Sequence, residues 1–326
     1  TIKQEKLNNQ AANLDVETSE NSIQESIAQI YIQILYAAES VKVNENTLQV
    51  SIAQRDRGQE LLNAGSIAKS DLAQLEAQVS TDRYQLVTAQ ATLQDYKLQL
   101  KQLLELDGEN EMNVYLPALS DENVLLPLPT KKDVYMSALT LRPEIEASKL
   151  SVEASELGID IAKAGYLPTI SLSAGIGTNH TSGSDFTFGE QVKNGWNNSI
   201  GVSVSVPIFN NRQTKSAVQK AKLQRETSLL SLLDEQKTLY KTIEGLWLDA
   251  NSAQQRYAAA NEKLRSTQIS YDLISEQFNL GMKNTVELLT EKNNLLQAQQ
   301  EQLQAKYMAI LNTQLLKFYQ GDKLAL

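Results

Sequence analysis

Apolar residues recur at seven-residue spacing along two long stretches of the chain. The first series is Leu72, Val79, Leu86, Leu93 and Leu100, and the second is Leu289, Leu296, Leu303 and Ile310. Such spacing keeps one stripe of a helix facing a partner helix, as in a coiled coil. Companion apolar residues lie three positions after most members of the first series, but Asp82 interrupts them. The pattern predicts long helices that pack as antiparallel pairs.

Glycine and proline, the main helix breakers, are almost absent from both stretches. Residues 1–62 contain only Gly58, 212–280 contain only Gly245, and 66–107 and 282–320 contain neither residue type. Each stretch therefore reads as two very long helices that meet at a tight turn, near Gly65 in one and near Gly281 in the other. At about 1.5 Å per residue, a helix of some 60 residues is roughly 90 Å long.

The two stretches are diverged copies of one another. An offset of 216 residues aligns the sequence around Gly65 with that around Gly281 and places Tyr31 opposite Trp247. The first 104 residues thus correspond to 217–320, and each copy is predicted as one helical hairpin. Tyr31 and Trp247 are interpreted as packing residues rather than parts of a binding site.

Between the copies the apolar period changes to two. Over 170–176 and 200–208, alternate residues are apolar and the others are small or polar. This alternation predicts two strands with one apolar face, each near the ~9–11 residues that a tilted strand needs to cross a bilayer. Aromatic residues at the strand ends resemble the girdles of membrane barrels: Tyr166, Phe186, Phe188, Trp196 and Phe209. A hairpin of a soluble sheet would alternate in the same way, but the very long flanking helices favour the membrane strand.

Two further segments lie between the helical copies. Prolines break the pattern after residue 104, and Pro143 followed by acidic residues opens a short helix. The predicted organisation is a first hairpin over 1–104, an equatorial connector over 105–142, a short helix over 143–165, a strand pair over 166–210 with an external loop over 178–198, a second hairpin over 211–320 and a tail over 321–326.

Composition excludes several classes of function. The chain has no cysteine, so disulfides and thiolate metal sites are impossible, and its one histidine, His180, lies in the polar loop. The net charge of −9 argues against a nucleic-acid partner, whose phosphates a binding protein must neutralise. No phosphate-binding loop, nucleophile elbow or metal-ligand cluster occurs. The sequence therefore predicts neither an enzyme nor a protein with a cofactor or metal.

The strand pair requires further strands. No run of about 18 apolar residues predicts a membrane-spanning helix, and two strands alone in lipid would leave backbone groups at their edges unpaired. Because the second copy follows a strand, the repeat implies a strand end just before Thr1. We expect the natural protein to have another hairpin, a preceding helix and a signal sequence before this point.

Five motifs together resemble the TolC-like outer-membrane efflux family over essentially the whole chain. They are Leu141-Arg142-Pro143-Glu144-Ile145, the segments 164–172 and 204–212, and the two turns at 63–72 and 279–288. The resemblance implies a homotrimer of the full-length protein in the outer membrane of a Gram-negative bacterium, with a β-barrel in the lipid and an α-helical tube in the periplasm. A periplasmic membrane-fusion adaptor and an inner-membrane pump would be its partners.

The function implied by the resemblance is a passive exit duct for small molecules or proteins in a tripartite efflux or type I secretion system. The alternative is a soluble coiled-coil adaptor of the same machinery. An adaptor would show one helical hairpin within a β domain, whereas this sequence shows two hairpins on either side of a strand pair.

The resemblance also suggests site residues. The turns would be tips that dock the adaptor, through Gly65, Ser66, Ile67, Ala68, Gly281, Met282 and Lys283. Asp71 and Glu287, each six residues past its turn glycine, would line the periplasmic aperture, where the family places a carboxylate at the second-copy position. Glu287 is one carbon longer than the usual Asp, and Thr290 stands where a second Asp often lies, so we expect a weaker ring of charge.

Overall fold

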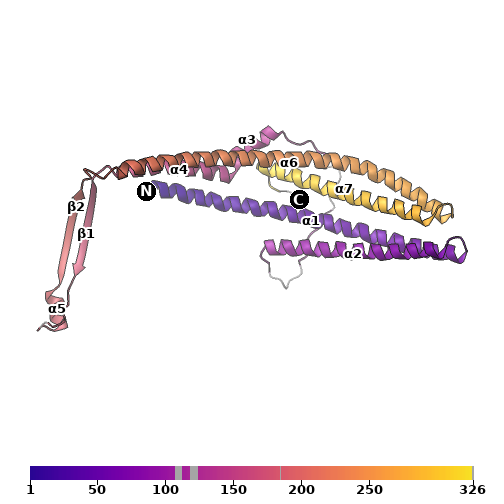
Figure 1. The fold of residues 1–326 in the computed structure, drawn as a ribbon, viewed down its shortest axis with the longest axis horizontal. Coiled ribbons are helices and arrows are strands. Elements are labelled where there is room, and N and C mark those ends of the chain that lie inside the picture. Colours follow the sequence, from indigo (N-terminus) through magenta and orange to yellow (C-terminus); the bar gives the residue numbers. More distant parts are fainter. Residues whose placement is uncertain (107–111, 118–123, 184, 325–326) are drawn as a thin grey trace. The chain divides into compact units, whose positions relative to one another are not determined.

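The computed structural model describes residues 1–106, 112–117, 124–183 and 185–324. Its elements are α1 (Ile2–Asn63), α2 (Lys69–Leu103), α3 (Lys131–Leu141), α4 (Pro143–Ala164), β1 (Thr169–Gly177), α5 (Phe188–Asn194), β2 (Asn197–Ser205), α6 (Gln213–Asn279) and α7 (Thr285–Tyr319) (Figure 1). The predicted fold class, long helical hairpins with one small strand pair, is confirmed. No helix in the described ranges carries a stretch long and apolar enough to cross a membrane.

The chain divides into two compact units, which are described separately. The first comprises Thr1–Leu14 and Glu146–Asp234, and the second comprises Asp15–Ile145 and Glu235–Leu326. In the first unit α4 packs along the beginning of α6. Ser155 Oγ lies 2.7 Å from Ser228 Oγ, and Arg225 Nη2 lies 2.9 Å from Glu156 Oε1. Gln4 Nε2 of α1 donates to the Ala154 carbonyl at 3.1 Å.

The strand pair of the first unit has one apolar face. Strands β1 and β2 are antiparallel, with Ile170 opposite Val204 and Leu172 opposite Val202. Directly opposite residues project to the same side of a sheet, so the apolar residues of both strands share a face. The apolar side chains of this face at 170, 172, 176, 200, 202 and 204 are between 61% and 83% exposed. The pair thus presents a continuous apolar surface that no described part of the chain covers.

The loop between the strands is ordered around one glutamine. The side-chain amide of Gln191 donates to the Phe186 carbonyl at 2.8 Å, and its oxygen accepts from the Thr181 N–H at 2.8 Å. His180 Nδ1 lies 3.1 Å from the same oxygen. The only histidine of the chain therefore helps to hold a surface loop.

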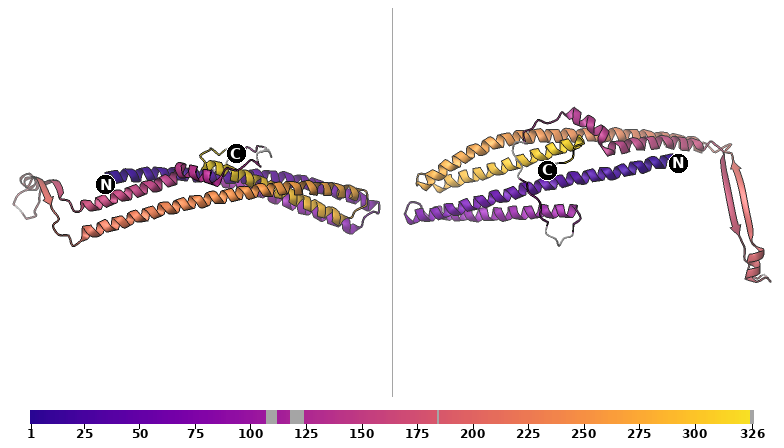
Figure 2. Two further views of the ribbon diagram at one scale, coloured as in Figure 1. Left: turned by 90° about the horizontal axis from the view of Figure 1, so that it is seen from above. Right: turned by 180° about the vertical axis from the view of Figure 1, so that it is seen from behind.

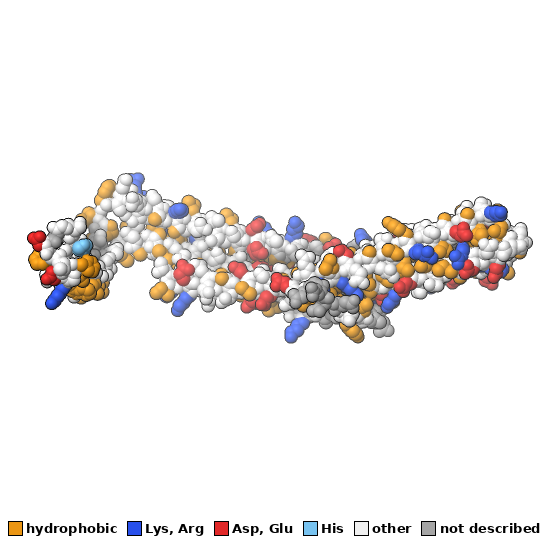
Figure 3. All heavy atoms as spheres, turned by 90° about the horizontal axis from the view of Figure 1, so that it is seen from below, with side chains coloured by type: hydrophobic (Ala, Val, Ile, Leu, Met, Phe, Trp, Pro, Cys, Tyr) orange, Lys and Arg blue, Asp and Glu red, His pale blue; other side chains and the backbone are white. Residues whose placement is uncertain are grey.

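The second unit holds the turn ends of both hairpins. Helices α1 and α2 run antiparallel, as do α6 and α7, and both turns lie at the same end of the unit (Figures 1 and 2). Far from the turns, α1 packs on α7 through an apolar cluster: Ala28, Ile32, Leu35, Leu303, Tyr307, Leu311 and Leu315. Acidic, basic and apolar side chains are interspersed along the helices on the face shown in Figure 3. The core is thus a thin seam of the coiled-coil kind.

The repeat-equivalent aromatics Tyr31 and Trp247 both bind the connector. The Tyr31 hydroxyl donates to the Tyr115 carbonyl at 2.8 Å, and Trp247 Nε1 donates to the Pro129 carbonyl at 3.0 Å. Lys131 Nζ lies 4.8 Å from the centre of the Trp247 ring. Their predicted packing role therefore includes a hydrogen bond that holds an irregular segment against each helical copy.

Removing either bond should loosen the connector. We expect Tyr31→Phe to lower the free energy of unfolding by about 1 kcal/mol, since a neutral hydrogen bond contributes about that much. Trp247→Phe should cost more, because it also removes part of a half-buried ring that lies against Lys131. Limited proteolysis should also cut faster near Tyr115 or Pro129, respectively. Tyr84→Phe is the control, because that side chain is 74% exposed. Unchanged cleavage in both variants would show that other contacts hold the connector.

A buried arginine joins α1, α7 and the junction between α3 and α4. Arg142 is 8% exposed; its Nε donates to Glu144 Oε1 at 2.8 Å and its Nη2 to Glu25 Oε1 at 3.3 Å. Its guanidinium lies 4.3 Å from the centre of the Tyr319 ring. Burial raises the pKa of Glu25, although Arg142 opposes this, and burial raises the pKa of Tyr319 to about 12. The Arg142 guanidinium is thus the counter-charge of both the Glu25 and the Glu144 carboxylates.

Glu25 should make stability depend on pH. Its pKa in the folded protein lies above the ordinary 4.5, so its contribution to stability is fully present below 4.5 and is lost as pH rises through the raised pKa. We expect the difference in free energy of unfolding between wild type and Glu25→Gln to fall from pH 4.5 to pH 7, measured with urea. Glu20→Gln, at an exposed position of the same helix, is the control. A difference that stays constant across this range would contradict the raised pKa.

Candidate functional site at the helical tips

Both turns have the same hydrogen-bonded geometry. Gly65 and Gly281 adopt φ of 76° and 74°. The N–H of each glycine donates at 2.9 Å to the carbonyl three residues earlier, and the next N–H donates at 2.8 Å to the carbonyl five residues before it. This is the Schellman arrangement, in which a left-handed glycine ends a helix and satisfies its last carbonyls. Glycine is required here because other residues adopt this conformation only with strain.

The two tips pack against one another. Leu61 and Leu75 of the first copy and Phe278 and Leu288 of the second form a buried apolar cluster, which we call the tip core. Arg57 Nη2 also donates at 3.0 Å to the carbonyl of Asn279, at the end of α6. The cluster and this bond place the two predicted docking turns side by side.

The seven predicted docking residues differ in exposure. Gly65, Ser66, Ala68, Gly281 and Met282 are exposed. The other two are Ile67, which is half-buried and packs on the tip core, and Lys283, which pairs with Glu287 at 2.5 Å. The structure therefore brings all seven together at one end of the second unit but turns one of them inward.

Asp71 and Glu287 occupy equivalent places in the first turns of α2 and α7. Asp71 Oδ2 accepts from the Ala68 N–H at 3.0 Å, and Glu287 Oε2 accepts from the Asn284 N–H at 3.2 Å. Asn284 Oδ1 in turn accepts from the Glu287 N–H at 2.9 Å, which completes a capping box. The Lys283 ammonium, followed by the Asn284 N–H, lowers the pKa of Glu287. Both carboxylates thus stabilise a helix start as well as adding charge near the tips.

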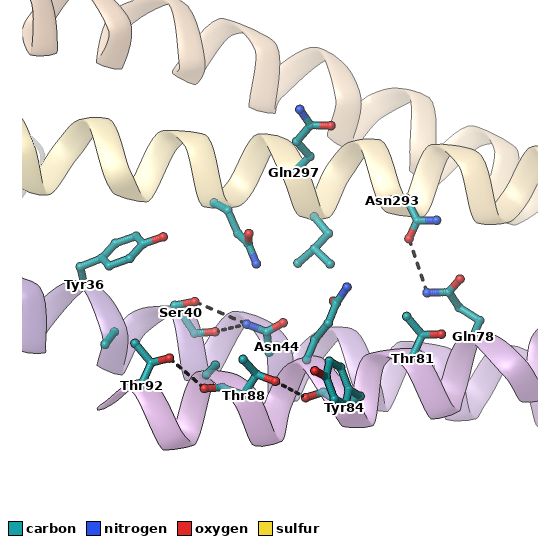
Figure 4. Close-up of a pocket in the computed structure, with 15 residues that line it drawn as sticks. Tyr36, Ser40, Asn44, Gln78, Thr81, Tyr84, Thr88, Thr92, Asn293 and Gln297 are labelled. Carbon is teal, nitrogen blue, oxygen red and sulfur yellow. Dashed lines mark hydrogen bonds between the residues drawn. The ribbon is translucent and has the colours of Figure 1, made fainter. Parts of the chain in front are cut away.

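A polar groove separates the hairpins above the tip core. It encloses about 600 Å³ between α1 and α2 on one side and α7 on the other. Figure 4 shows its hydroxyl and amide walls, with Gln78 Nε2 3.5 Å from Asn293 Oδ1 and Asn44 Nδ2 2.7 Å from the Ser40 carbonyl. None of the described residues that line it is charged. Among described residues, no group of three or more His, Asp or Glu is placed to hold a metal ion.

A buried ion pair lies between the groove and the tip core. Lys292 Nζ of α7 pairs with Asp82 Oδ2 of α2, and their side chains are only 3% and 1% exposed. Ser51 Oγ of α1 donates to the same oxygen at 2.5 Å and also accepts from Lys292. Gln78 Nε2 donates at 2.9 Å to Asp82 Oδ1. We call Asp82, Lys292 and Ser51 the buried triad; Asp82 stood out in the sequence only as a break in the apolar stripe.

The architecture defines a class of protein: two long helical hairpins, one before and one after a strand pair in the sequence, and one apolar face on that strand pair. A family model described as outer membrane efflux protein matches residues 134–321, and the chain belongs to this family. The adaptor alternative, which requires one hairpin within a β domain, does not fit this architecture.

Known relatives agree with this assignment. The chain is 25% identical to the outer membrane efflux protein BepC of Brucella suis biovar 1 (strain 1330), over 90% of this chain and 61% of that protein. It is also 25% identical to the outer membrane protein TolC of Escherichia coli (strain K12), over 91% and 60% respectively. The chain thus spans about 60% of the length of these relatives.

Solved structures share the fold. The CusC structure superposes with a TM-score of 0.81 at 19% identity, covering 98% of this chain and 73% of that chain. The CmeC outer membrane channel of Campylobacter jejuni superposes with a TM-score of 0.78 at 19% identity, covering 99% and 68%. At this identity the likeness establishes the arrangement of helices and strands.

Proposed function

We propose that the whole protein is an outer-membrane exit duct of a tripartite efflux or type I secretion system, and that it is a passive conduit rather than an enzyme. The observation that carries the proposal is the uncovered apolar face of β1 and β2 in a chain whose helices α1 and α6 run for 62 and 67 residues. Such strands are stable in lipid only within a closed barrel, and such helices are far longer than a compact domain needs.

The family and its named members support this proposal. Relatives include the alkaline protease secretion protein AprF, the pyoverdine export protein OpmQ and the cation efflux system protein CusC. Because these names span a protease, pyoverdine and a cation, the shared fold does not select the cargo. We infer that selectivity lies in the pump that feeds the duct.

The partners follow from the same proposal. Three copies would close the barrel in the outer membrane, with the apolar strand face against lipid and the helices in the periplasm. The paired tips would meet the hairpins of a periplasmic adaptor, which links the duct to an inner-membrane pump. The exposed glycines at 65 and 281, with small neighbours such as Ser66 and Ala68, would let a partner backbone approach closely.

Asp71 and Glu287 would surround the periplasmic aperture in the trimer. Their common place in the first turn beyond each tip supports this role. A threefold axis would gather both carboxylates from every copy, and such a ring attracts cations. Lys283 would offset part of that charge, since it pairs with Glu287 inside each copy.

Conductance of the full-length protein in planar bilayers tests two proposals: that the protein forms a channel, and that Glu287 lines its aperture. We expect Glu287→Ala to reduce cation preference and block by divalent cations, and Lys283→Met, which removes the counter-charge, to increase both. The absence of any channel would contradict the duct. If a channel forms but its ion selectivity responds to neither substitution, Glu287 does not line the aperture, whereas the proposal of an exit duct still holds.

A further inference from the structure

The interface between the two hairpins changes character along its length. It begins at the tips with the apolar tip core, continues through the buried triad and the polar groove, and ends in the apolar cluster around Leu35 and Leu303. The triad joins three helices at one point: Ser51 lies on α1, Asp82 on α2 and Lys292 on α7. Two of these helices belong to the first copy and one to the second.

Apolar heptads alone do not define how far one hairpin is shifted along the other. A shift of seven residues, about 10 Å along a helix, again places apolar residues against apolar residues. The same shift would bring Thr285 or Gln299 to the place of Lys292. Asp82 would then be a buried charge without a counter-charge, which is strongly destabilising, whereas the observed register pairs it with Lys292 and Ser51.

The triad also breaks the internal repeat. At the offset of 216 residues, Asp82 corresponds to Ala298, and Lys292 corresponds to Glu76. Ala298 is fully buried and Glu76 is exposed. The charged contact therefore distinguishes the two copies, although their apolar seams are alike, and it selects one face of α2 for one face of α7.

We propose that Asp82, Lys292 and Ser51 form a register lock that fixes the axial position of the second hairpin on the first and so holds the two tips level. The lock lies within a few turns of both tips, beyond the tip core. The polar groove on its other side offers water-accessible amides and hydroxyls, which tolerate displacement better than a buried charge does. The lock thus favours one register of the two hairpins, which neither the tip core nor the polar groove does.

Distance measurements between the tips test the lock. The chain has no cysteine, so cysteines introduced at the exposed Ala64 and Leu280 can carry a pair of spin labels. Labelled full-length chains are diluted with unlabelled ones, so that pulsed electron resonance records only distances within a chain. With the triad intact, we expect one narrow distance. With Asp82→Leu and Lys292→Met together, we expect helicity and melting temperature to be retained, because apolar residues of similar volume often replace a buried ion pair without loss.

The distance distribution should nevertheless change in this double variant. We expect the population of displaced registers to rise at least about tenfold, as a second maximum or a broad distribution. Leu303→Met, on the same face of α7 with the triad intact, is the control and should keep one distance. A single unchanged distance in the double variant would overturn the lock. If the double variant loses helicity, Asp82→Asn with Lys292→Gln, which removes both buried charges and leaves neither unpaired, decides by the same criterion.

Discussion

Replacing Arg142 with Met should lower the free energy of unfolding by about 3–5 kcal/mol, the usual cost of removing one partner from a buried ion pair. The Arg142 side chain is 9% exposed, and Glu144 and Glu25, its two partners, are 18% and 22% exposed. Without the guanidinium, both carboxylates would remain largely buried with no cation between them. Packing over Tyr319 and Phe318 would also be lost.

Related variants separate charge from packing at this cluster. Arg142→Lys keeps the charge, but one ammonium does not reproduce the planar fork that reaches both carboxylates, so we expect an intermediate loss. Lys149→Met is the control, since its pair with Glu146 at 3.1 Å is half-exposed and should contribute at most about 1 kcal/mol. Urea unfolding measures all three. A loss below about 1 kcal/mol for Arg142→Met would mean that water reaches the carboxylates in the folded protein.

The long helices and the strand pair were predictable because their signals are local. Heptad spacing and the absence of Gly and Pro over some 60 residues leave few alternatives to a helical hairpin. The turn at Gly65 was predictable for the same reason. The same pattern recurs at Gly281, which indicates that it marks a turn in both copies. The alternation around Leu172 similarly identifies a strand with one apolar face.

The buried triad was not predictable, because it depends on contact between the two copies. Charged residues on long helices are mostly solvated, and nothing near Lys292 in the sequence marks it as buried. Its burial follows from the register of α7 on α1 and α2, which apolar heptads do not define. In the sequence, Asp82 is recognisable only as a polar residue within an apolar stripe. This position alone does not indicate which residue Asp82 pairs with.

The capping role of Glu287 has a local signal in the sequence. Asn284 followed by a glutamate three residues later is the pattern of a capping box. The equivalent Asp71 follows Ala68, which has no polar side chain, so only half of the pattern is present there. The family resemblance suggested Glu287 and the repeat suggested the equivalent Asp71; neither describes the local hydrogen bonds of these carboxylates.

Replacing both turn glycines with asparagine should abolish export by the full-length protein while leaving it folded. The experiment must separate bulk from backbone strain, because Gly65 and Gly281 both have positive φ. A Cβ at either position would meet no atom within 4 Å, so the cost of substitution is conformational rather than steric. Asparagine tolerates this conformation better than most residues, whereas alanine adds strain with little bulk.

We therefore expect two double variants to have opposite effects on export and on stability. Gly65→Asn with Gly281→Asn should keep the melting temperature close to wild type but reduce export to background, because the added side chains would stand where an adaptor backbone must approach. Gly65→Ala with Gly281→Ala should lower stability by about 1–2 kcal/mol per site yet retain most export. Export is measured as drug or protein efflux in cells that lack the native duct, with trimer content checked in the outer membrane. If the asparagine pair exports normally, the tips are not where the adaptor docks, and the two glycines serve only to close the helical turns.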